Sequence, residues 1–520
     1  MSSNFKSTLL VTACSLGLLA LPVIATAQSV EERQAPPAAK PKATADDLDY
    51  SMKVFGISRA EAKERRDVTS LIETEAKVIS EKFPQSFIGT IIEDKPARVV
   101  LVFDRDVSVA DLNAAVSPEL RRYIKIKRSK LTGEQIISNQ QALLKLVPLS
   151  ATSASVNYDQ QTDRFEVTVA GEDNAKAVRD ALPAELRPIT RVREARETSV
   201  QTAGQRTGFA EEPENYGYND VAYSGFPLFS SGRKVCTLGF LSHDYNTREA
   251  GVLTAGHCDN ALGIKYTNLD GTTRGLGTID IERDAPAGSV SYDYQHYKAP
   301  TFWKRAYLWF DASTSGRFIH GCEYNGTNCS EGSFANVDGQ LPLKGWLKIN
   351  YANQAGSQPS WNTAHPVGAV RCKSGMTSGY SCGVITEQTA TAYIRLQQDN
   401  TQTTQYNGIV KVAVRDFMVM GYYGDSGGPV FTMPVYNTRT GWFEATGSGI
   451  LIHAKIEGDG TLNAARDRPC VLHLQSREGT RSTTDTDCYV TYMPIDRIND
   501  HRSSIALKTM VDEQDSYVIP

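Results

Sequence analysis

Apolar residues recur at helical spacing near the start of the chain and at strand spacing through its second half. From about residue 51 to 85, charged residues alternate with apolar ones at helical spacing. The apolar residues are Val54, Ile57, Ala60, Val68, Leu71, Ile72, Ala76 and Ile79. This spacing predicts an amphipathic helix or a pair of helices. From about residue 235, short apolar or alternating runs such as VCTLGFL, GIVKVAV and GSGILIHAKI are separated by clusters of Gly, Asn, Asp and Ser. Many short strands with turn signals predict an all-β barrel or sandwich there.

An internal repeat lies between these two regions. The stretch RVVLVFDRDVSVADLNAAVSPELRRYIKIKR begins at Arg98, and RFEVTVAGEDNAKAVRDALPAELRPITRVRE begins at Arg164. Each copy has the pattern of a strand, an amphipathic helix, a turn with proline and a short strand. We therefore expect two α+β units ahead of the strand-rich region. Near the other end, MPIDRINDHRSSIALKTM fits a closing helix, with Pro494 near its first turn.

Composition marks a domain boundary and narrows the classes of partner. Residues 30–200 are rich in charged residues and lack Cys and Trp, whereas the chain beyond about residue 215 holds all 5 Trp and all but one of the 9 Cys. The net charge of −4 over 520 residues is small, so it indicates neither a nucleic-acid partner nor an anionic membrane surface.

The first 27 residues have the pattern of a secretory signal. Lys6 precedes the apolar run TLLVTACSLGLLALPVIA, and Ala25 to Ala27 match a small-residue cleavage site. A retained membrane helix is the lesser alternative because the run is short and a proline-containing polar tract follows it. Lipidation at Cys14 is another, since VTAC loosely resembles a lipoprotein box. We expect an exported protein, extracellular or periplasmic, with no membrane attachment after signal removal.

Loss of Cys14 with the signal would leave eight cysteines in an oxidising compartment, which favours disulfides. A zinc site is the rival interpretation, but the chain has no Cys-x2-Cys pair and only 8 His. We expect no metal and no cofactor. Sequence proximity suggests the pairs Cys236–Cys258, Cys322–Cys329, Cys372–Cys382 and Cys470–Cys488.

Two short segments carry the candidate chemistry. In GYYGDSGGPV, Ser426 lies in a glycine-rich turn and is either a nucleophile or a turn residue. A nucleophilic serine needs a base, an orienting acid and donors for an oxyanion. In GVLTAGHCDN, an apolar strand leads into His257, and Cys258 could hold that turn through a disulfide. His257 is therefore the candidate base.

Together, LTAGHC and GDSGGP resemble the chymotrypsin-like serine peptidases, in which His comes first and Ser last along the chain. CTLGF at 236–240 and CKSGMTSGYSCG at 372–383 are similar to the bacterial streptogrisin and alpha-lytic branch. The resemblance implies two six-stranded antiparallel β-barrels with a C-terminal helix. It also implies an N-terminal pro-region that assists folding and is cut off, and the repeat looks like such a pro-region.

The resemblance implies an aspartate between His257 and Ser426 in chain order. Asp293 in SVSYDYQHY resembles the family's Asp-Tyr strand, while Asp280, Asp284 and Asp311 are rivals. Asp293 would fix the His257 tautomer, and the amides of Gly424 and Ser426 would form the oxyanion hole. The resemblance to the bacterial branch also implies that Asp425 pairs with Lys373, which follows the first cysteine of the 372–382 pair.

The specificity strand departs from the family pattern. Aligning Gly449 to Leu451 with the family's Gly-Ile-Val puts Ile452, His453 and Ala454 where Ser, an aromatic or small residue, and Gly are usual. Loss of that Ser would remove a hydrogen bond to the catalytic aspartate. In an alternative alignment, Ser448 makes this hydrogen bond. Apolar residues at 417–422 weakly favour an apolar side chain at the cleavage site.

These observations predict a signal peptide at 1–27, a linker and α+β pro-region at 28–205, and a chymotrypsin-like peptidase domain at 206–520. The expected activity is that of a secreted serine endopeptidase, made as a pro-enzyme, that acts on a protein or peptide substrate. A catalytically silent binding protein is one alternative, motivated by the divergent specificity strand and by insertions at 300–365 and 456–489. An esterase is another, although Pro429 and a strand-like run follow Ser426 where an esterase has a helix.

Overall fold

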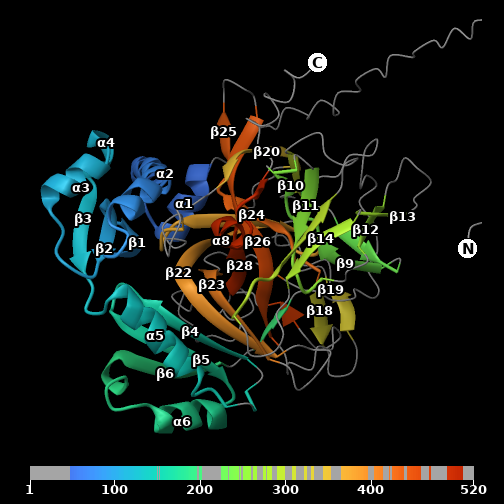
Figure 1. Cartoon of the computed structure of the whole chain (residues 1–520). Coiled ribbons are helices and arrows are strands. Elements are labelled where there is room, and N and C mark those ends of the chain that lie inside the picture. The colour runs from blue at the N-terminus through green and yellow to red at the C-terminus, as the bar shows by residue number, and fades with distance from the viewer. Residues whose placement is uncertain are drawn as a thin grey trace, which may run out of the picture. The chain divides into compact units, whose positions relative to one another are not determined.

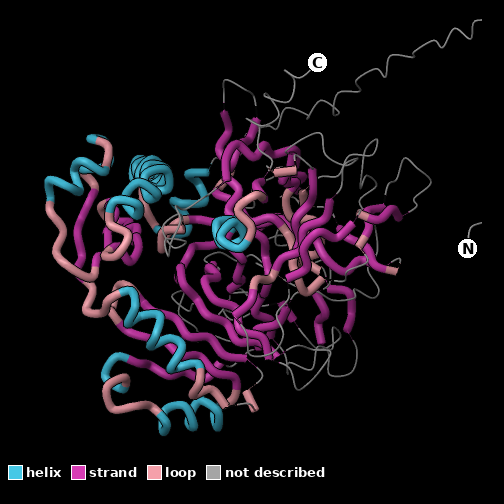
Figure 2. Tube along the Cα trace, viewed as in Figure 1, coloured by secondary structure: helices cyan, strands magenta, loops and turns pink. Residues whose placement is uncertain are grey.

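The structure is a computed structural model. It describes residues 47–201, apart from 149, 152, 196 and 197, and residues 224–507 with several gaps. The part up to residue 195 mixes helices and strands, and the part from 224 is mostly β (Figures 1 and 2). The signal and most of the linker lie outside the described residues. Among the described helices, none is both long and apolar enough to cross a membrane.

Two helices form the first described segment, as the apolar spacing predicts: α1 (Asp47–Phe55) and α2 (Arg59–Lys82). A capping box starts α2, because the Ser58 hydroxyl accepts from the Glu61 amide at 3.3 Å and the Glu61 carboxylate accepts from the Ser58 amide at 2.7 Å. The buried face of α2 includes Val68, Ile72, Ala76 and Ile79.

The repeat folds as two similar α+β units, and the structure adds a helix and a strand ahead of each copy. The first unit continues from α2 through β1 (Phe87–Asp94), β2 (Ala97–Phe103), α3 (Val109–Ala115), α4 (Pro118–Arg121) and β3 (Ile124–Arg128). The second comprises α5 (Gly133–Leu144), β4 (Ser153–Asp159), β5 (Arg164–Ala170), α6 (Glu172–Ala181), the 3-10 helix η1 (Arg187–Ile189) and β6 (Thr190–Ala195). In each unit the first two strands are antiparallel and the last is parallel to its neighbour.

Six strands close into an antiparallel barrel in the second half of the chain, each pairing with the next and the last with the first. In order around the barrel they are β21 (Val370–Gly375), β22 (Gly379–Arg395), β23 (Thr403–Ala413), β28 (Tyr489–Pro494), β26 (Trp442–Glu457) and β24 (Pro429–Thr432). This barrel positions the turn that carries Ser426, because the turn leads directly into β24.

Two further sheets come from the region ahead of this barrel and from the short strand β29 (Ile505–Leu507) after it. A five-stranded sheet has the order β14 (Thr278–Arg283), β16 (Tyr294–Lys298), β11 (Ala250–Thr254), β10 (Leu241–Asp244) and β29. A four-stranded sheet has the order β13 (Thr273–Gly275), β12 (Gly263–Lys265), β8 (Pro227–Ser230) and β9 (Arg233–Thr237). The expected second six-stranded barrel is thus seen as two open sheets among the described residues.

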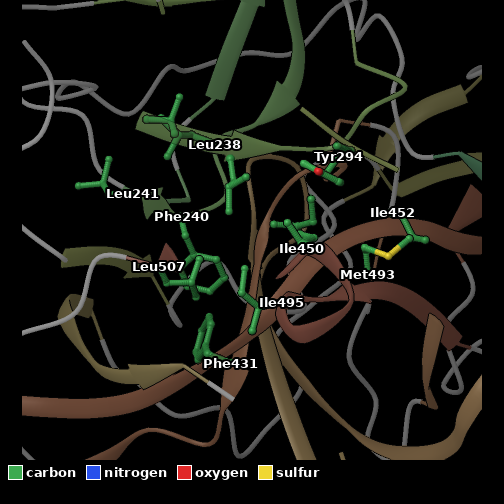
Figure 3. Packing of buried hydrophobic residues seen from close by; sticks show 14 of the residues in the cluster. Leu238, Phe240, Leu241, Tyr294, Phe431, Ile450, Ile452, Met493, Ile495 and Leu507 are labelled. Atoms are coloured by element: carbon green, nitrogen blue, oxygen red, sulfur yellow. The ribbon is translucent and has the colours of Figure 1, made fainter. Parts of the chain in front are cut away.

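One buried cluster joins the five-stranded sheet to the six-stranded barrel. Figure 3 shows part of it: Leu238, Phe240, Leu241, Tyr294, Phe431, Ile450, Ile452, Met493, Ile495 and Leu507. Ile495 belongs to α8 (Ile495–His501), the expected closing helix, which begins after Pro494 and is followed by the short strand β29. The cluster brings the start of β16 close to β26, and this proximity builds the candidate site.

The insertions contribute strands of their own: β17 (Tyr307–Asp311), β18 (Gly321–Tyr324), β19 (Cys329–Gly332), β20 (Lys344–Ala352) and β27 (Arg468–Pro469). The remaining strands are β7 (Thr198–Gln201), β15 (Val290–Ser291) and β25 (Val435–Asn437). The disulfides Cys236–Cys258 and Cys372–Cys382 are present, which confirms two of the expected pairs. The Cys322–Cys329 and Cys470–Cys488 pairs lie outside the described side chains.

Candidate active site

His257 lies in the turn that follows strand β11. The backbone of this turn is closed by a hydrogen bond from the Cys258 amide to the Ala255 carbonyl at 3.2 Å, and Cys258 is tied to Cys236 at the end of β9. The His257 side chain is 1% exposed. A strand end and a crosslink therefore hold the imidazole in place within a buried site.

Asp293 accepts two hydrogen bonds from His257. Its Oδ2 atom lies 2.7 Å from His257 Nδ1, and its Oδ1 atom accepts from the His257 amide at 3.0 Å. Asp293 lies between β15 and β16 and is fully buried. Of the rivals, Asp280 and Asp311 lie in β14 and β17, where their side chains are not described, and Asp284 lies outside the described residues.

Ser426 completes this line of hydrogen bonds. Its Oγ atom lies 2.7 Å from His257 Nε2. A carboxylate can only accept, so the Asp293 contact requires the proton of a neutral His257 to be on Nδ1. Nε2 then accepts from the serine hydroxyl, which is the arrangement that a general base needs.

The charge of Asp293 matches this arrangement. Burial by itself would raise the pKa of the Asp293 carboxyl, but the neighbouring charge of His257 and the hydrogen bonds from His257 lower that pKa below its ordinary value. The group is therefore a carboxylate at neutral pH. A buried carboxylate beside Nδ1 stabilises the imidazolium that forms when His257 takes a proton.

The glycine-rich turn needs a backbone that other residues rarely adopt. Gly424 has φ +93° and Gly427 has φ +83°, both in the left-handed region. A Cβ atom at Gly424 would also collide with the side chains of Met376 and Thr377. These two positions therefore require glycine for geometric reasons.

Hydrogen bonds fix the direction of the peptide groups in this turn. Thr237 holds two of them, because its hydroxyl donates to the Gly424 carbonyl and its amide to the Ser426 carbonyl, both at 2.8 Å. The Asp425 carbonyl accepts from the Gly428 amide at 2.9 Å. The Ser426 N–H belongs to the same trans peptide group and points the opposite way. This orientation suits a donor to an oxyanion beside Ser426.

Asp425 lies buried behind the turn and pairs with Lys373. Its Oδ2 atom is 3.6 Å from Lys373 Nζ, and both side chains are at most 1% exposed. The Asp425 carboxylate also accepts from the amides of Thr377 at 2.8 Å and Ser378 at 3.1 Å, and from the Ser378 hydroxyl. Burial lowers the pKa of Lys373, and Asp425 opposes that shift. Asp425 thus anchors the turn to the hairpin of the second disulfide.

We expect Asp425→Asn to destabilise the domain by about 1.5–3 kcal/mol, the range for a hydrogen bond to a charged group. The amide keeps an acceptor for the Thr377 amide but removes the charge opposite the buried Lys373 ammonium. Urea unfolding of a Ser426→Ala background measures the change. Asp106→Asn is the matched control, because Asp106 is exposed and pairs with the exposed Arg128 at 3.2 Å. Equal stability of the two variants would contradict the anchoring role.

His453 in β26 also lies at this site. Its Nε2 atom is 3.9 Å from Asp293 Oδ2, and its ring is stacked beside the His257 ring, with centroids 6.1 Å apart and planes at 14°. Sequence alignment placed this residue at the specificity pocket and associated Ile452 or Ser448 with Asp293. Ile452 instead packs in the core, and Ser448 is buried without a hydrogen-bond partner for its hydroxyl. A register shift in β26, invisible in the sequence, explains the difference.

The remaining parts of the predicted pocket are only partly described. Residues 417–420, 422 and 423 lie outside the described residues, so the expectation of an apolar pocket base stays a prediction. Ala454 is fully buried, and a Cβ atom at Gly421 would approach it closely. In the described part of the chain, no three His, Cys, Asp or Glu side chains are grouped as metal ligands.

Comparisons with known proteins add resemblances of low similarity. No family profile and no curated protein matches the chain. Among solved structures, Thermobifida fusca protease A has 17% identity and a TM-score of 0.28, covering 55% of this chain and 98% of its own. Cellulomonas bogoriensis chymotrypsin has 19% identity and Nocardiopsis protease has 18%, each with a TM-score of 0.28 and the same two coverages.

Proposed function

We propose that this protein is a secreted serine endopeptidase of the chymotrypsin-like type, made as a pro-enzyme. The observation that carries the proposal is the continuous line from Asp293 through His257 to Ser426, with 2.7 Å at each side-chain contact. The three residues come from separate parts of the chain and meet where the five-stranded sheet approaches the barrel. Structural packing alone gives no reason for a buried carboxylate, an imidazole and a hydroxyl to align in this order.

The geometry supports hydrolysis through an acyl-enzyme. Ser426 Oγ attacks the carbonyl carbon of the scissile bond while its proton passes to His257 Nε2. The oxyanion of the tetrahedral intermediate accepts from the amides of Gly424 and Ser426, and Asp293 stabilises the imidazolium. The intermediate collapses, and the leaving amine takes the proton from His257. Water, deprotonated by His257, then attacks the acyl group. The second tetrahedral intermediate releases Ser426 Oγ, which takes the proton back from His257.

An esterase built on a nucleophile elbow fits this site less well. That elbow joins a strand to a helix directly after the serine. Here Pro429 begins strand β24, which lies in the six-stranded barrel. The local chain path after Ser426 therefore supports the peptidase alternative.

The experiment that tests the proposal is labelling with a fluorophosphonate probe, which reacts covalently with an activated serine. We expect stoichiometric labelling of the mature protein and no labelling of Ser426→Ala. An unreactive wild-type protein would refute the peptidase proposal and favour a silent binding protein. Labelling that persists in Ser426→Ala would place the nucleophile elsewhere.

The pro-enzyme part of the proposal is supported by strand β7. It pairs antiparallel with β26, placing Gln201 opposite His453 and Thr198 opposite Ile456. The Leu451 carbonyl accepts from the Gly427 amide at 2.7 Å, so the Leu451 end of β26 adjoins the Ser426 turn. From Thr198 to Gln201 the chain therefore runs toward Ser426 as an extended peptide. An added antiparallel strand is also how an extended peptide binds a free sheet edge.

We infer that residues 28–205 form a pro-region that occupies the substrate-binding edge until cleavage between about 195 and 235. Mass spectrometry of the secreted protein tests this inference. The experiment compares the wild-type protein with Ser426→Ala. We expect both to have lost residues 1–27, and only the wild type to have lost the pro-region as well. A wild-type protein that is active yet retains the whole pro-region would overturn it.

A further inference from the structure

His453 reaches Asp293 because of an irregularity in β26. Ile450 and Ile452 pack in the core that includes Tyr294, as Figure 3 shows, while Leu451 and Ala454 pack in a second buried cluster. Simple alternation would place His453 on the same face as Leu451. The pairing with β28 shifts register between Leu451 and His453, which is a β-bulge. Such a bulge re-aims a side chain, and here His453 lies on the side of Asp293.

A cross-strand partner holds the His453 ring. Its Nδ1 atom lies 3.1 Å from the hydroxyl of Thr491, its pairing partner in β28. The ring is fully buried. Ladder pairing, the Thr491 hydroxyl and the neighbouring His257 ring thus restrict how the imidazole can turn.

These contacts determine which nitrogen of His453 carries the proton. The nitrogen that faces a carboxylate is favourable only as a donor, so Nε2 carries the hydrogen and Nδ1 accepts from Thr491. Burial lowers the pKa of His453 to about 3; the charge of Asp293 opposes that shift and the charge of His257 adds to it. The ring is therefore neutral at neutral pH, and Asp293 and His257 are the charged neighbours that influence its pKa.

We propose that His453 is a positioning residue that directs its Nε2–H dipole at the Asp293 carboxylate and keeps the His257 ring in line with Ser426. The proposal rests on the serine peptidase function. At 3.9 Å the contact is longer than a hydrogen bond, so His453 acts through its dipole and by filling the space beside His257. His453 thereby supplies the polar neighbour of Asp293 that the sequence at Ile452 lacks.

This role predicts an effect on the basicity of His257. A donor facing Asp293 partly offsets the negative charge that stabilises the His257 imidazolium. Removing that donor while keeping the ring volume raises the affinity of His257 for its proton. The acid side of the activity profile then moves to higher pH.

The experiment compares His453→Phe, which keeps a planar ring without a donor, with His453→Gln, which keeps an N–H near the Nε2 position. In ¹⁵N-histidine NMR titrations on a Ser426→Ala background, we expect the His257 pKa to rise by about half a unit in His453→Phe. His453→Gln should stay close to the parent. In the active enzyme, we expect the acid limb of kcat/KM to move to higher pH by the same amount in His453→Phe and to stay in place in His453→Gln.

Thr491→Val provides a variant that does not touch Asp293. It removes only the hydroxyl that orients His453, and we expect it to shift the His257 titration in the same direction as His453→Phe, by less. An unchanged His257 titration in His453→Phe, or equal shifts in the Phe and Gln variants, would overturn the proposal. The NMR measurement needs no turnover, so it tests the contact between His453 and Asp293 even in an inactive protein. An inactive wild-type protein would refute the peptidase function alone.

Discussion

Replacing Asp293 with Asn is expected to lower kcat by about 10⁴-fold, the loss seen when this aspartate is neutralised in a related type of site. The Asn side chain has nearly the same shape, so the hydrogen bond to the His257 amide at 3.0 Å can persist. Its amide group removes the negative charge and can donate to Nδ1. The imidazole then carries its proton on Nε2, where it cannot accept from Ser426.

A pH–rate profile of Asp293→Asn distinguishes this explanation from loss of structure. The Asp293 carboxylate, whose pKa is lowered by His257 against the effect of burial, stabilises protonated His257. Without that charge the His257 pKa falls, so the acid limb of kcat/KM moves to lower pH. Gln295 is the matched control on the same stretch. It donates to the carbonyls of Gly256 and Cys258, so Gln295→Met tests the support of the turn without adding or removing a charge beside Asp293. Activity of Asp293→Asn within tenfold of wild type would contradict the assigned role.

Replacing Glu73 with Ala is expected to lower the free energy of unfolding of the full chain by about 3–5 kcal/mol. Glu73 lies on α2, and its Oε1 atom is 2.7 Å from Nη1 of Arg371 in barrel strand β21. Arg371 is 1% exposed and Glu73 14%. Burial would lower the pKa of Arg371, but the charge of Glu73 and the contact with Tyr492 raise it. Removing Glu73 therefore takes away the carboxylate that lies against this buried guanidinium.

Urea unfolding of the uncleaved Ser426→Ala chain measures the Glu73→Ala effect. The matched control is Asp67→Ala on the same helix, because Asp67 pairs with Lys63 at 2.6 Å and both side chains are largely exposed. The control should cost no more than about 1 kcal/mol. If the two variants unfold at the same urea concentration, Arg371 does not depend on Glu73. A confirmed difference would show that α2 stabilises the barrel through the contact between Glu73 and Arg371.

The pattern of apolar residues predicted the helices and strands well where their spacing along the chain was regular. The spacing from Val54 to Ile79 predicted the pair α1 and α2, and the repeat predicted strand, helix and strand in both copies. Sequence proximity predicted Cys236–Cys258 and Cys372–Cys382. Cys372 and Cys382 are cross-strand partners in the hairpin of β21 and β22, and Cys236 near the end of β9 meets Cys258 in the turn after β11. The repeat in the sequence did not reveal that β1 belongs to the first unit and β4 to the second.

Contacts between distant residues needed the tertiary structure. The sequence left four aspartates open, and only the packing of β16 beside β11 places Asp293 against His257. The pairing of β7 with β26 and of Glu73 with Arg371 joins residues more than 250 positions apart. Neither periodicity nor turn chemistry specifies which strand edges or buried charges will meet.

What the sequence by itself determined is therefore the set of local elements and the two motifs with His257 and Ser426, because periodicity, turn residues and nearby cysteines act over short distances. What only the tertiary structure decided is which groups share the site. His453 shows the reason: one register shift between Leu451 and His453 changes the face of the strand on which a side chain lies. That shift depends on how β26 packs between β28, β24 and the core, and no local rule encodes it.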